Sequence, residues 1–217
     1  MTMPISLQSD PRYQGKLIEF ETPEQIPPHW KETPIEKLIL AANFDTPIEA
    51  SGKPELLIVT CIEFRYSLPV PKMYAYKIRR ASGRLIGSEF SLAYVLSRGV
   101  RHLALVGHND CGMAKVSEHR PAMIEALAEQ GWNRERAEEF VGYHAMRYAI
   151  DDEMSSLERE YHRLKRLFKR VHIAPLMLCL EDSKLYLPKW YHEWYQTQVS
   201  TGKQPAIVPD EELLTVL

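Results

Sequence analysis

Three residues with metal-binding side chains follow two apolar runs of the chain. His108 and Cys111, separated by two residues, close the run HLALVGHNDCG, and Cys61 comes directly after the run LLIVT. Apolar runs of this length are typical of buried parallel strands, and α/β proteins build their sites where such strands end. Two thiolates and one imidazole suit zinc in a tetrahedral site whose fourth position stays open.

Each half of this pattern is a weak signal by itself. An isolated H-x-x-C is short enough to occur by chance, and a lone cysteine after an apolar strand is more often a small buried hydrophobe. If the two strands are neighbours, however, Cys61, His108 and Cys111 converge at one edge of the sheet. The two halves together therefore favour a shared metal site.

Four short motifs extend the pattern and occur in a fixed order. They are CIEFR at 61–65, RRASG at 79–83, SLAY at 91–94 and GHNDCG at 107–112. With them the chain resembles the β-class carbonic anhydrases, whose pattern is C-x-D-x-R after one strand, an R-N-A-G stretch, an S-L-x-Y-type helix and H-x-x-C-G after another strand. The resemblance covers residues 55–116 well, with a further strand near 171–187.

The resemblance implies a zinc enzyme, a carbonic anhydrase (carbonate dehydratase). This lyase hydrates carbon dioxide reversibly to bicarbonate by zinc-bound hydroxide. Cys61, His108 and Cys111 would bind the Zn²⁺ ion. In the family, the acid of C-x-D-x-R accepts a hydrogen bond from the hydroxide and the arginine pairs with that acid, so Glu63 and Arg65 would be catalytic. Some members act on carbonyl sulfide or carbon disulfide, which makes a related small substrate an alternative.

Glu63 departs from the family pattern, which has Asp at this position. Its carboxylate reaches about 1.5 Å further. It can therefore become a fourth metal ligand and close the site, as the family's Asp does in an inactive arrangement, which would leave a non-catalytic zinc-binding homologue. It can also keep a bidentate pair with Arg65 while misdirecting the hydroxide. An ordinary ion pair within a turn is the simplest alternative.

Two further departures lie in the RRASG motif, where Arg80 replaces Asn and Ser82 replaces Gly. A second guanidinium beside Arg79 makes the local field more positive. Arg79, Arg80 and Gly112 are therefore candidates for binding bicarbonate or another anion, and a structural ion pair at an interface is an equal alternative for the two arginines. Asp110 is a candidate outer acceptor or simply a loop residue.

Composition limits the classes of protein that fit. The 217 residues are 45% apolar and 26% charged, which is ordinary for a soluble globular protein. With 27 Lys+Arg against 29 Asp+Glu the net charge is −2, so nothing global calls for nucleic acid. Three cysteines fit a reducing compartment better than a disulfide framework. Without a signal-peptide pattern or a long apolar run, we expect a cytoplasmic protein that acts without a membrane.

These signals predict one α/β domain over 1–217, with a central, mostly parallel sheet flanked by helices. Its expected parts are an N-terminal arm and helix (1–50), a metal-site core (55–116), a helical segment (117–170), and a last strand with a C-terminal tail (171–217). The resemblance implies a homodimer or a higher even oligomer, with carbon dioxide and bicarbonate as the small-molecule partners.

Local patterns predict several elements within these parts. The proline-rich arm should pack on a protein surface, because Trp30 is too apolar for a solvated tail. Thr33 and Pro34 predict an N-capped helix that runs to about Phe44. Another strand is expected over 74–78. Pro175 suits an edge strand or a bulge better than a sheet centre.

Overall fold

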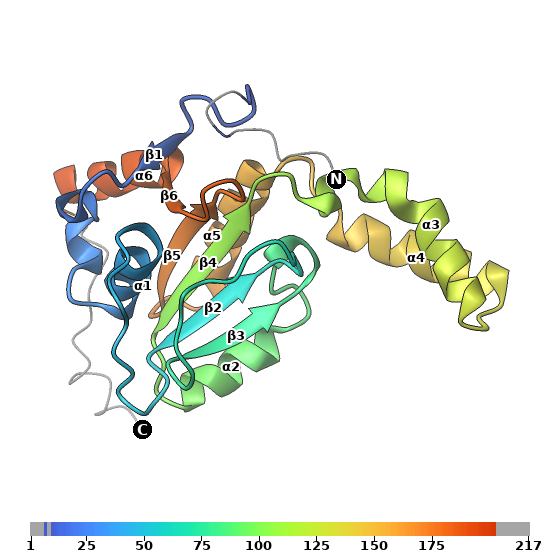
Figure 1. Ribbon diagram of the computed structural model, residues 1–217, viewed down its shortest axis with the longest axis horizontal. Helices are drawn as coiled ribbons and strands as arrows, with labels where there is room; N and C mark the ends of the chain where they lie inside the picture. Colours follow the sequence, from blue (N-terminus) through green and yellow to red (C-terminus); the bar gives the residue numbers. More distant parts are fainter. Residues whose placement is uncertain (1–6, 8–9, 203–217) are drawn as a thin grey trace.

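The computed structural model describes residue 7 and residues 10–202, which form one six-stranded sheet flanked by helices (Figure 1). The strand order is β1-β6-β5-β4-β2-β3. The strands are β1 (Leu17–Glu19), β2 (Leu56–Thr60), β3 (Ala75–Arg79), β4 (His102–His108), β5 (His172–Leu178) and β6 (Leu185–Pro188). The apolar runs before Cys61 and around His108 are therefore strands, as predicted.

The sheet is mostly parallel, which confirms the expected fold class. Strands β3, β2, β4 and β5 run parallel, while β6 and β1 are added antiparallel at one side. Strands β2 and β4 are direct neighbours, with Thr60 opposite Val106. Every residue of β2 is buried, as expected of a parallel strand covered on both faces. This pairing brings the segments after the two strands to the same edge of the sheet.

The described residues form six α-helices, two of which project away from the sheet (Figure 1). The six are α1 (Pro34–Asn43), α2 (Glu89–Ser97), α3 (Val116–Glu129), α4 (Arg134–Tyr148), α5 (Glu153–Leu167) and α6 (Lys189–Ser200), with short 3₁₀ turns at Pro23–Gln25, Pro28–Trp30, Ala81–Gly83 and Gly112–Lys115. Helix α1 begins as predicted, because the Thr33 side chain accepts a hydrogen bond from the Ile35 N–H and Pro34 occupies the first turn. Helix α5 packs on β4 and β5.

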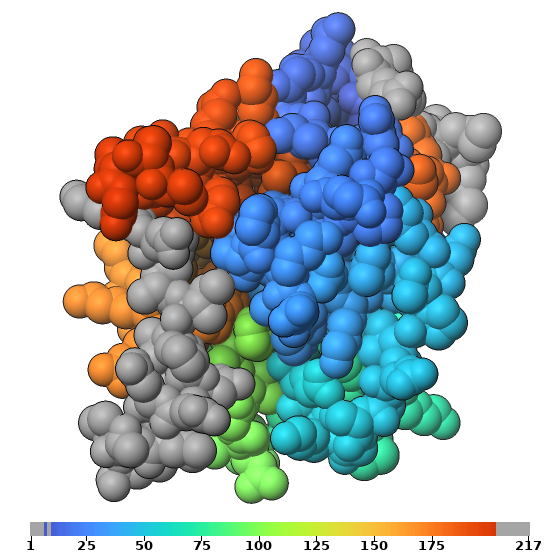
Figure 2. All heavy atoms as spheres, turned by 90° about the vertical axis from the view of Figure 1, so that its left-hand side faces the viewer, coloured from blue at the N-terminus to red at the C-terminus, as the bar shows by residue number. Residues whose placement is uncertain are grey.

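The N-terminal arm lies on the body of the protein and also extends its sheet. Residues 17–19 pair with β6 as an edge strand, which the sequence pattern did not reveal. The Trp30 ring stacks on Tyr191 of α6 at 5.3 Å between ring centroids. Figure 2 shows the N-terminal segment and the C-terminal helix side by side on one face. The arm therefore couples the two ends of the described chain.

The prediction that Pro175 belongs at an edge or a bulge is wrong. Strand β5 lies between β4 and β6, and Pro175 pairs in register with Leu105. The His172 N–H points toward β4, where it donates to Arg101 O, so alternation turns the nitrogen of Pro175 toward β6. Of the residues of β5, only Met177 and Leu178 pair with β6. The missing N–H of the proline therefore removes no ladder hydrogen bond.

Helices α3 and α4 pack against each other and extend away from the sheet (Figure 1). Their ends meet at the body, where the Ile150 N–H donates to Met113 O. Among the described residues, no helix combines the length and apolar character needed to cross a bilayer.

Candidate metal centre

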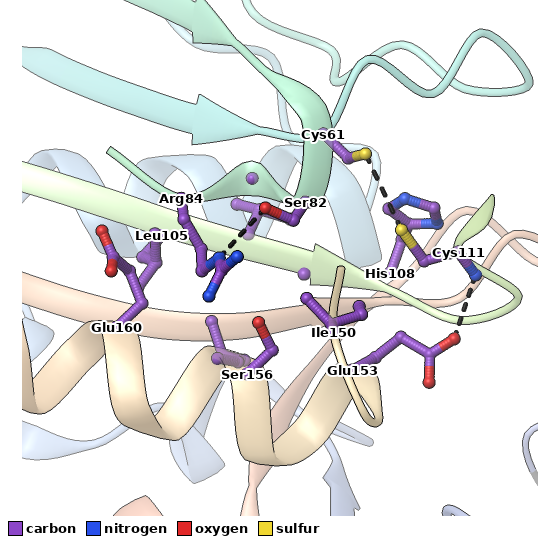
Figure 3. Close-up of a pocket in the computed structure, with 14 residues that line it drawn as sticks. Cys61, Ser82, Arg84, Leu105, His108, Cys111, Ile150, Glu153, Ser156 and Glu160 are labelled. Carbon is purple, nitrogen blue, oxygen red and sulfur yellow. Dashed lines mark hydrogen bonds between the residues drawn. The ribbon is translucent and has the colours of Figure 1, made fainter. Parts of the chain in front are cut away.

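The structure brings Cys61, His108 and Cys111 together at the edge of the sheet where β2 and β4 end. Their ligand atoms all lie within 4.8 Å of one another, and all three residues are buried. Figure 3 shows the two thiols pointing toward each other with the His108 ring beside them. The expected convergence follows from the pairing of β2 with β4, because each cysteine segment starts directly after its strand.

The geometry of these residues fits zinc. Two sulfurs bound tetrahedrally at about 2.3 Å from one zinc ion lie about 3.8 Å apart, and the Cys61 and Cys111 Sγ atoms are 3.8 Å apart. The Nε2 atom of His108 is buried and has no hydrogen-bond partner among the described residues. Its Nδ1 atom lies 2.9 Å from Asn109 O, an arrangement that leaves Nε2 available to a metal.

The two thiols also influence each other's ionisation. The hydrogen bond from the Cys111 thiol lowers the pKa of Cys61, and contacts with His108 act in the same direction. The same sulfur–sulfur hydrogen bond, together with burial, raises the pKa of Cys111. One thiolate is therefore favoured in the cluster without a metal, and a bound divalent cation would replace the proton of the second thiol.

Glu63 is held by Arg65 through a bidentate ion pair. The Arg65 Nε donates to Oε1 at 2.8 Å and Nη2 donates to Oε2 at 2.7 Å, while the Arg65 backbone N–H also donates to Oε1. These hydrogen bonds lower the pKa of Glu63 to about 2. The carboxylate stays near the metal residues, with Oε2 at 4.0 Å from His108 Nδ1. Oε1 accepts two hydrogen bonds and Oε2 one, so Oε2 keeps an acceptor position.

Comparisons with protein-family models and with curated protein sequences find no match. The fold does match solved structures. A β-carbonic anhydrase from Trichomonas vaginalis aligns with a TM-score of 0.51 and 19% identity over 67% of this chain and 88% of that one. A carbonic anhydrase from Glaciozyma antarctica aligns with a TM-score of 0.50 and 21% identity over 71% and 95% of the two chains. The chain has the β-carbonic anhydrase fold.

Within the β-carbonic anhydrase fold, the RRASG motif packs closely against the backbone of the Cys61 segment. Gly83 has a φ of +65°, and a Cβ atom at this position would lie 3.2 Å from the Cys61 nitrogen. Ser82, where the family pattern has Gly, also adopts a positive φ of 63°. Glycine takes this conformation without strain and serine does not, so the motif keeps its turn at an energetic cost.

The two arginines of this motif make different contacts. The Arg79 Nε donates to Cys61 O at 3.4 Å, which places Arg79 beside the metal residues. Arg80 points elsewhere: its guanidinium donates to the Ser88 hydroxyl and, at 2.7 Å, to Tyr148 Oη of α4. The structure thus gives Arg80 partners within its own chain. Gly112 opens the turn directly after Cys111, with nothing within 4 Å of a Cβ built on it.

Glu153 is a site residue that the sequence pattern did not reveal. It is only 4% exposed, and its Oε1 accepts a hydrogen bond from the Cys111 N–H at 3.0 Å (Figure 3). The Arg12 guanidinium of the N-terminal arm lies 3.8 Å from the same oxygen. Glu153 also lines a cavity between the metal residues and α5. No local motif marks this residue, because its contact spans 42 positions of sequence.

Proposed function

We propose that this chain is a divergent β-carbonic anhydrase that binds zinc and hydrates carbon dioxide reversibly to bicarbonate. The observation that carries the proposal is the buried cluster of Cys61, His108 and Cys111, whose sulfur–sulfur distance of 3.8 Å fits one tetrahedral zinc ion. The fold and the order of the motifs support the same activity. Cys61, His108 and Cys111 would hold the metal and leave one position open.

The residues around the metal position would orient the nucleophile. When bound, zinc would lower the pKa of a water and so supply a nucleophile near neutral pH. Glu63 Oε2 has an acceptor position left and would take a hydrogen bond from that nucleophile. Arg65 keeps the Glu63 carboxylate charged and fixes its direction through two hydrogen bonds. These two residues are thus the proposed catalytic pair, and Arg79 is the candidate contact for the anionic product.

The alternative of a closed, non-catalytic site requires Glu63 to leave Arg65 and bind the metal. The bidentate pair supports the open arrangement, because the carboxylate would have to give up three hydrogen bonds from Arg65 to become a ligand. The longer side chain of Glu63 still makes the closed arrangement geometrically accessible. Activity therefore depends on how firmly Arg65 is held.

Stopped-flow hydration of carbon dioxide, followed with a pH indicator on zinc-loaded protein, tests the proposal. We expect one zinc per chain and a rate well above that of the buffer. Cys111→Ser should lose both zinc and activity, whereas Cys179→Ser is the matched control, since Cys179 is also buried but lies outside the cluster. Zinc-loaded protein without hydration activity would refute the proposal. Turnover of carbonyl sulfide in its place would identify the alternative substrate.

We also propose that the protein is a cytoplasmic homodimer, or a higher even oligomer built from that dimer. Helix α2 is apolar on two sides: Leu92 and Val95 are buried against its own chain, while Phe90 is 84% exposed and Tyr94 is exposed too. Proteins usually cover exposed apolar patches, and a second copy of the chain would cover this outer face. The chain's three free cysteines fit a reducing compartment.

A further inference from the structure

Arg65 is held from two separate segments of the site. Besides Glu63, it contacts Asp110: Nη1 donates to Asp110 Oδ2 at 2.7 Å and Nη2 donates to Asp110 O at 3.0 Å. Glu63 belongs to the segment after β2, and Asp110 lies between His108 and Cys111 in the segment after β4. One guanidinium thus connects the two segments that carry the metal ligands.

The position of Asp110 is set by its own loop. Its backbone has a φ of +52°, a conformation that Asp tolerates better than most residues. The next residue, Cys111, is fixed through its N–H by the buried Glu153 carboxylate. The loop that carries His108 and Cys111 therefore fixes the position of the Asp110 carboxylate. Arg65 contacts the carboxylate at that fixed position.

We propose that Asp110 is a positioning residue that locks Arg65 across the site and thereby keeps Glu63 away from the metal. The inference rests on the proposed function and explains how the chain tolerates a glutamate at this position. An arginine bound to Glu63 alone could swing away and release the carboxylate to the metal. With Asp110 holding the other side of the guanidinium, Arg65 cannot leave Glu63 without losing two further hydrogen bonds.

Cobalt(II)-substituted protein tests this inference without using catalysis. Azide binding to the open position is followed by the visible spectrum of the cobalt ion, in the wild type and in Asp110→Asn. In the open state Glu63 stays on Arg65 and the fourth metal position is free. If only about one tenth of the variant is in this state, the apparent dissociation constant for azide rises about tenfold. Asp45→Asn is the matched control, since Asp45 also has a positive φ but lies in an exposed loop. It should bind azide as the wild type does.

A double variant separates positioning from general damage. Asp110→Asn combined with Glu63→Ala removes the carboxylate that is expected to close the site, so azide affinity should return to the wild-type value. A double variant that still binds azide weakly overturns the inference, as does an Asp110→Asn protein that binds azide normally or takes up less than one cobalt per chain. Wild-type protein that binds cobalt and azide but does not hydrate carbon dioxide would refute the proposed function alone.

Discussion

At the scale of single residues, the proposed chemistry depends on where the Glu63 carboxylate points. A glutamate here has the reach to bind the metal or to face the nucleophile, and its own chemistry does not decide between the two. The decision comes from its hydrogen bonds: Arg65 donates three to Glu63 and two to Asp110. Charge-assisted bonds of this kind are among the stronger ones in proteins.

Glu63→Gln should lower the rate of carbon dioxide hydration about a hundredfold, the usual size of effect for losing one oriented hydrogen bond in an active site. The amide cannot form the bidentate ion pair with Arg65, so its direction is lost. Glu63→Asp restores the family's acid and should retain or raise the rate. Stopped-flow kinetics on samples of equal zinc content would measure both. An unchanged rate in Glu63→Gln would remove Glu63 from the mechanism.

Gly83→Ala should destabilise the fold and weaken zinc binding. The left-handed φ of +65° costs an alanine about 1–3 kcal/mol, and its Cβ would press on the Cys61 nitrogen at 3.2 Å. Gly99→Ala is the matched control, because Gly99 has a φ of +88° and open space around a Cβ. Urea unfolding should show a loss in both variants, while a chelator competition should show weaker zinc binding in Gly83→Ala only. Equal zinc affinity in the two variants would contradict this role of Gly83.

At the scale of elements, a partly buried histidine connects the N-terminal arm to α6. The His29 ring stacks on Tyr195 of α6 with 3.9 Å between ring centroids, and its Nε2 lies 2.8 Å from Tyr191 Oη. Burial lowers the pKa of His29 to about 4, with the charge of His172 acting in the same direction. The contact between the N-terminal arm and α6 therefore favours a neutral imidazole.

Acid should weaken this contact. The pKa of a histidine in the unfolded chain is about 6.5, whereas that of His29 in the folded protein is about 4. Between these pH values His29 is protonated in the unfolded chain and neutral in the folded protein. The contribution of neutral His29 to the free energy of unfolding is fully present above pH 6.5. It falls as the pH drops toward 4, by up to about 3 kcal/mol. Urea unfolding at pH 7.5 and 4.5 measures the loss, which should be smaller in His29→Gln. His119→Gln, an exposed position on α3, should lose as much stability as the wild type; an equal loss in His29→Gln would exclude His29 as the cause.

Local patterns predicted those elements whose signal lies within a few residues. The apolar runs before Cys61 and around His108 identified two parallel strands, and Thr33 with Pro34 marked the start of α1. Contacts between distant segments left no such signal. Residues 17–19 pair with β6, across most of the chain, and Pro175 is tolerated in the sheet only because β6 is short.

The candidate site also contains features that local sequence patterns predict and features that depend on contacts between distant segments. The ligand cluster and the Glu63–Arg65 pair follow from short motifs, because each residue stands at a fixed distance from the end of its strand. Glu153 and the second set of contacts made by Arg65 depend on how loops meet in three dimensions. The sequence leaves Arg80 between anion binding and a structural ion pair, and its hydrogen-bond partners in the structure are Ser88 and Tyr148.

At the scale of the whole molecule, the described chain leaves several apolar side chains uncovered away from its core. Large exposed ones lie on α2, on the projecting α3–α4 pair and beside the metal residues: Phe90 and Tyr94, Trp132, Phe140, Tyr143 and Met146, and Ile62 and Phe64. Strand β3 is also the edge strand of the described sheet on this side. Unpaired sheet edges and apolar patches are features that proteins usually cover.

We expect the protein in solution to have at least twice the mass of its 25.2 kDa chain. Replacing Phe90 and Tyr94 together by Glu places two charges on the outer face of α2. The free energy needed to bury two unpaired charges in an interface exceeds the free energy gained from the contact. The double variant should therefore be monomeric in light scattering at micromolar concentration. Leu167→Glu is the matched control, because Leu167 is an exposed apolar residue at the end of α5, and it should leave the mass unchanged. A monomeric wild type would contradict the dimer. A double variant that stays dimeric would instead place the contact on the α3–α4 pair or the β3 edge, where the remaining exposed apolar groups lie.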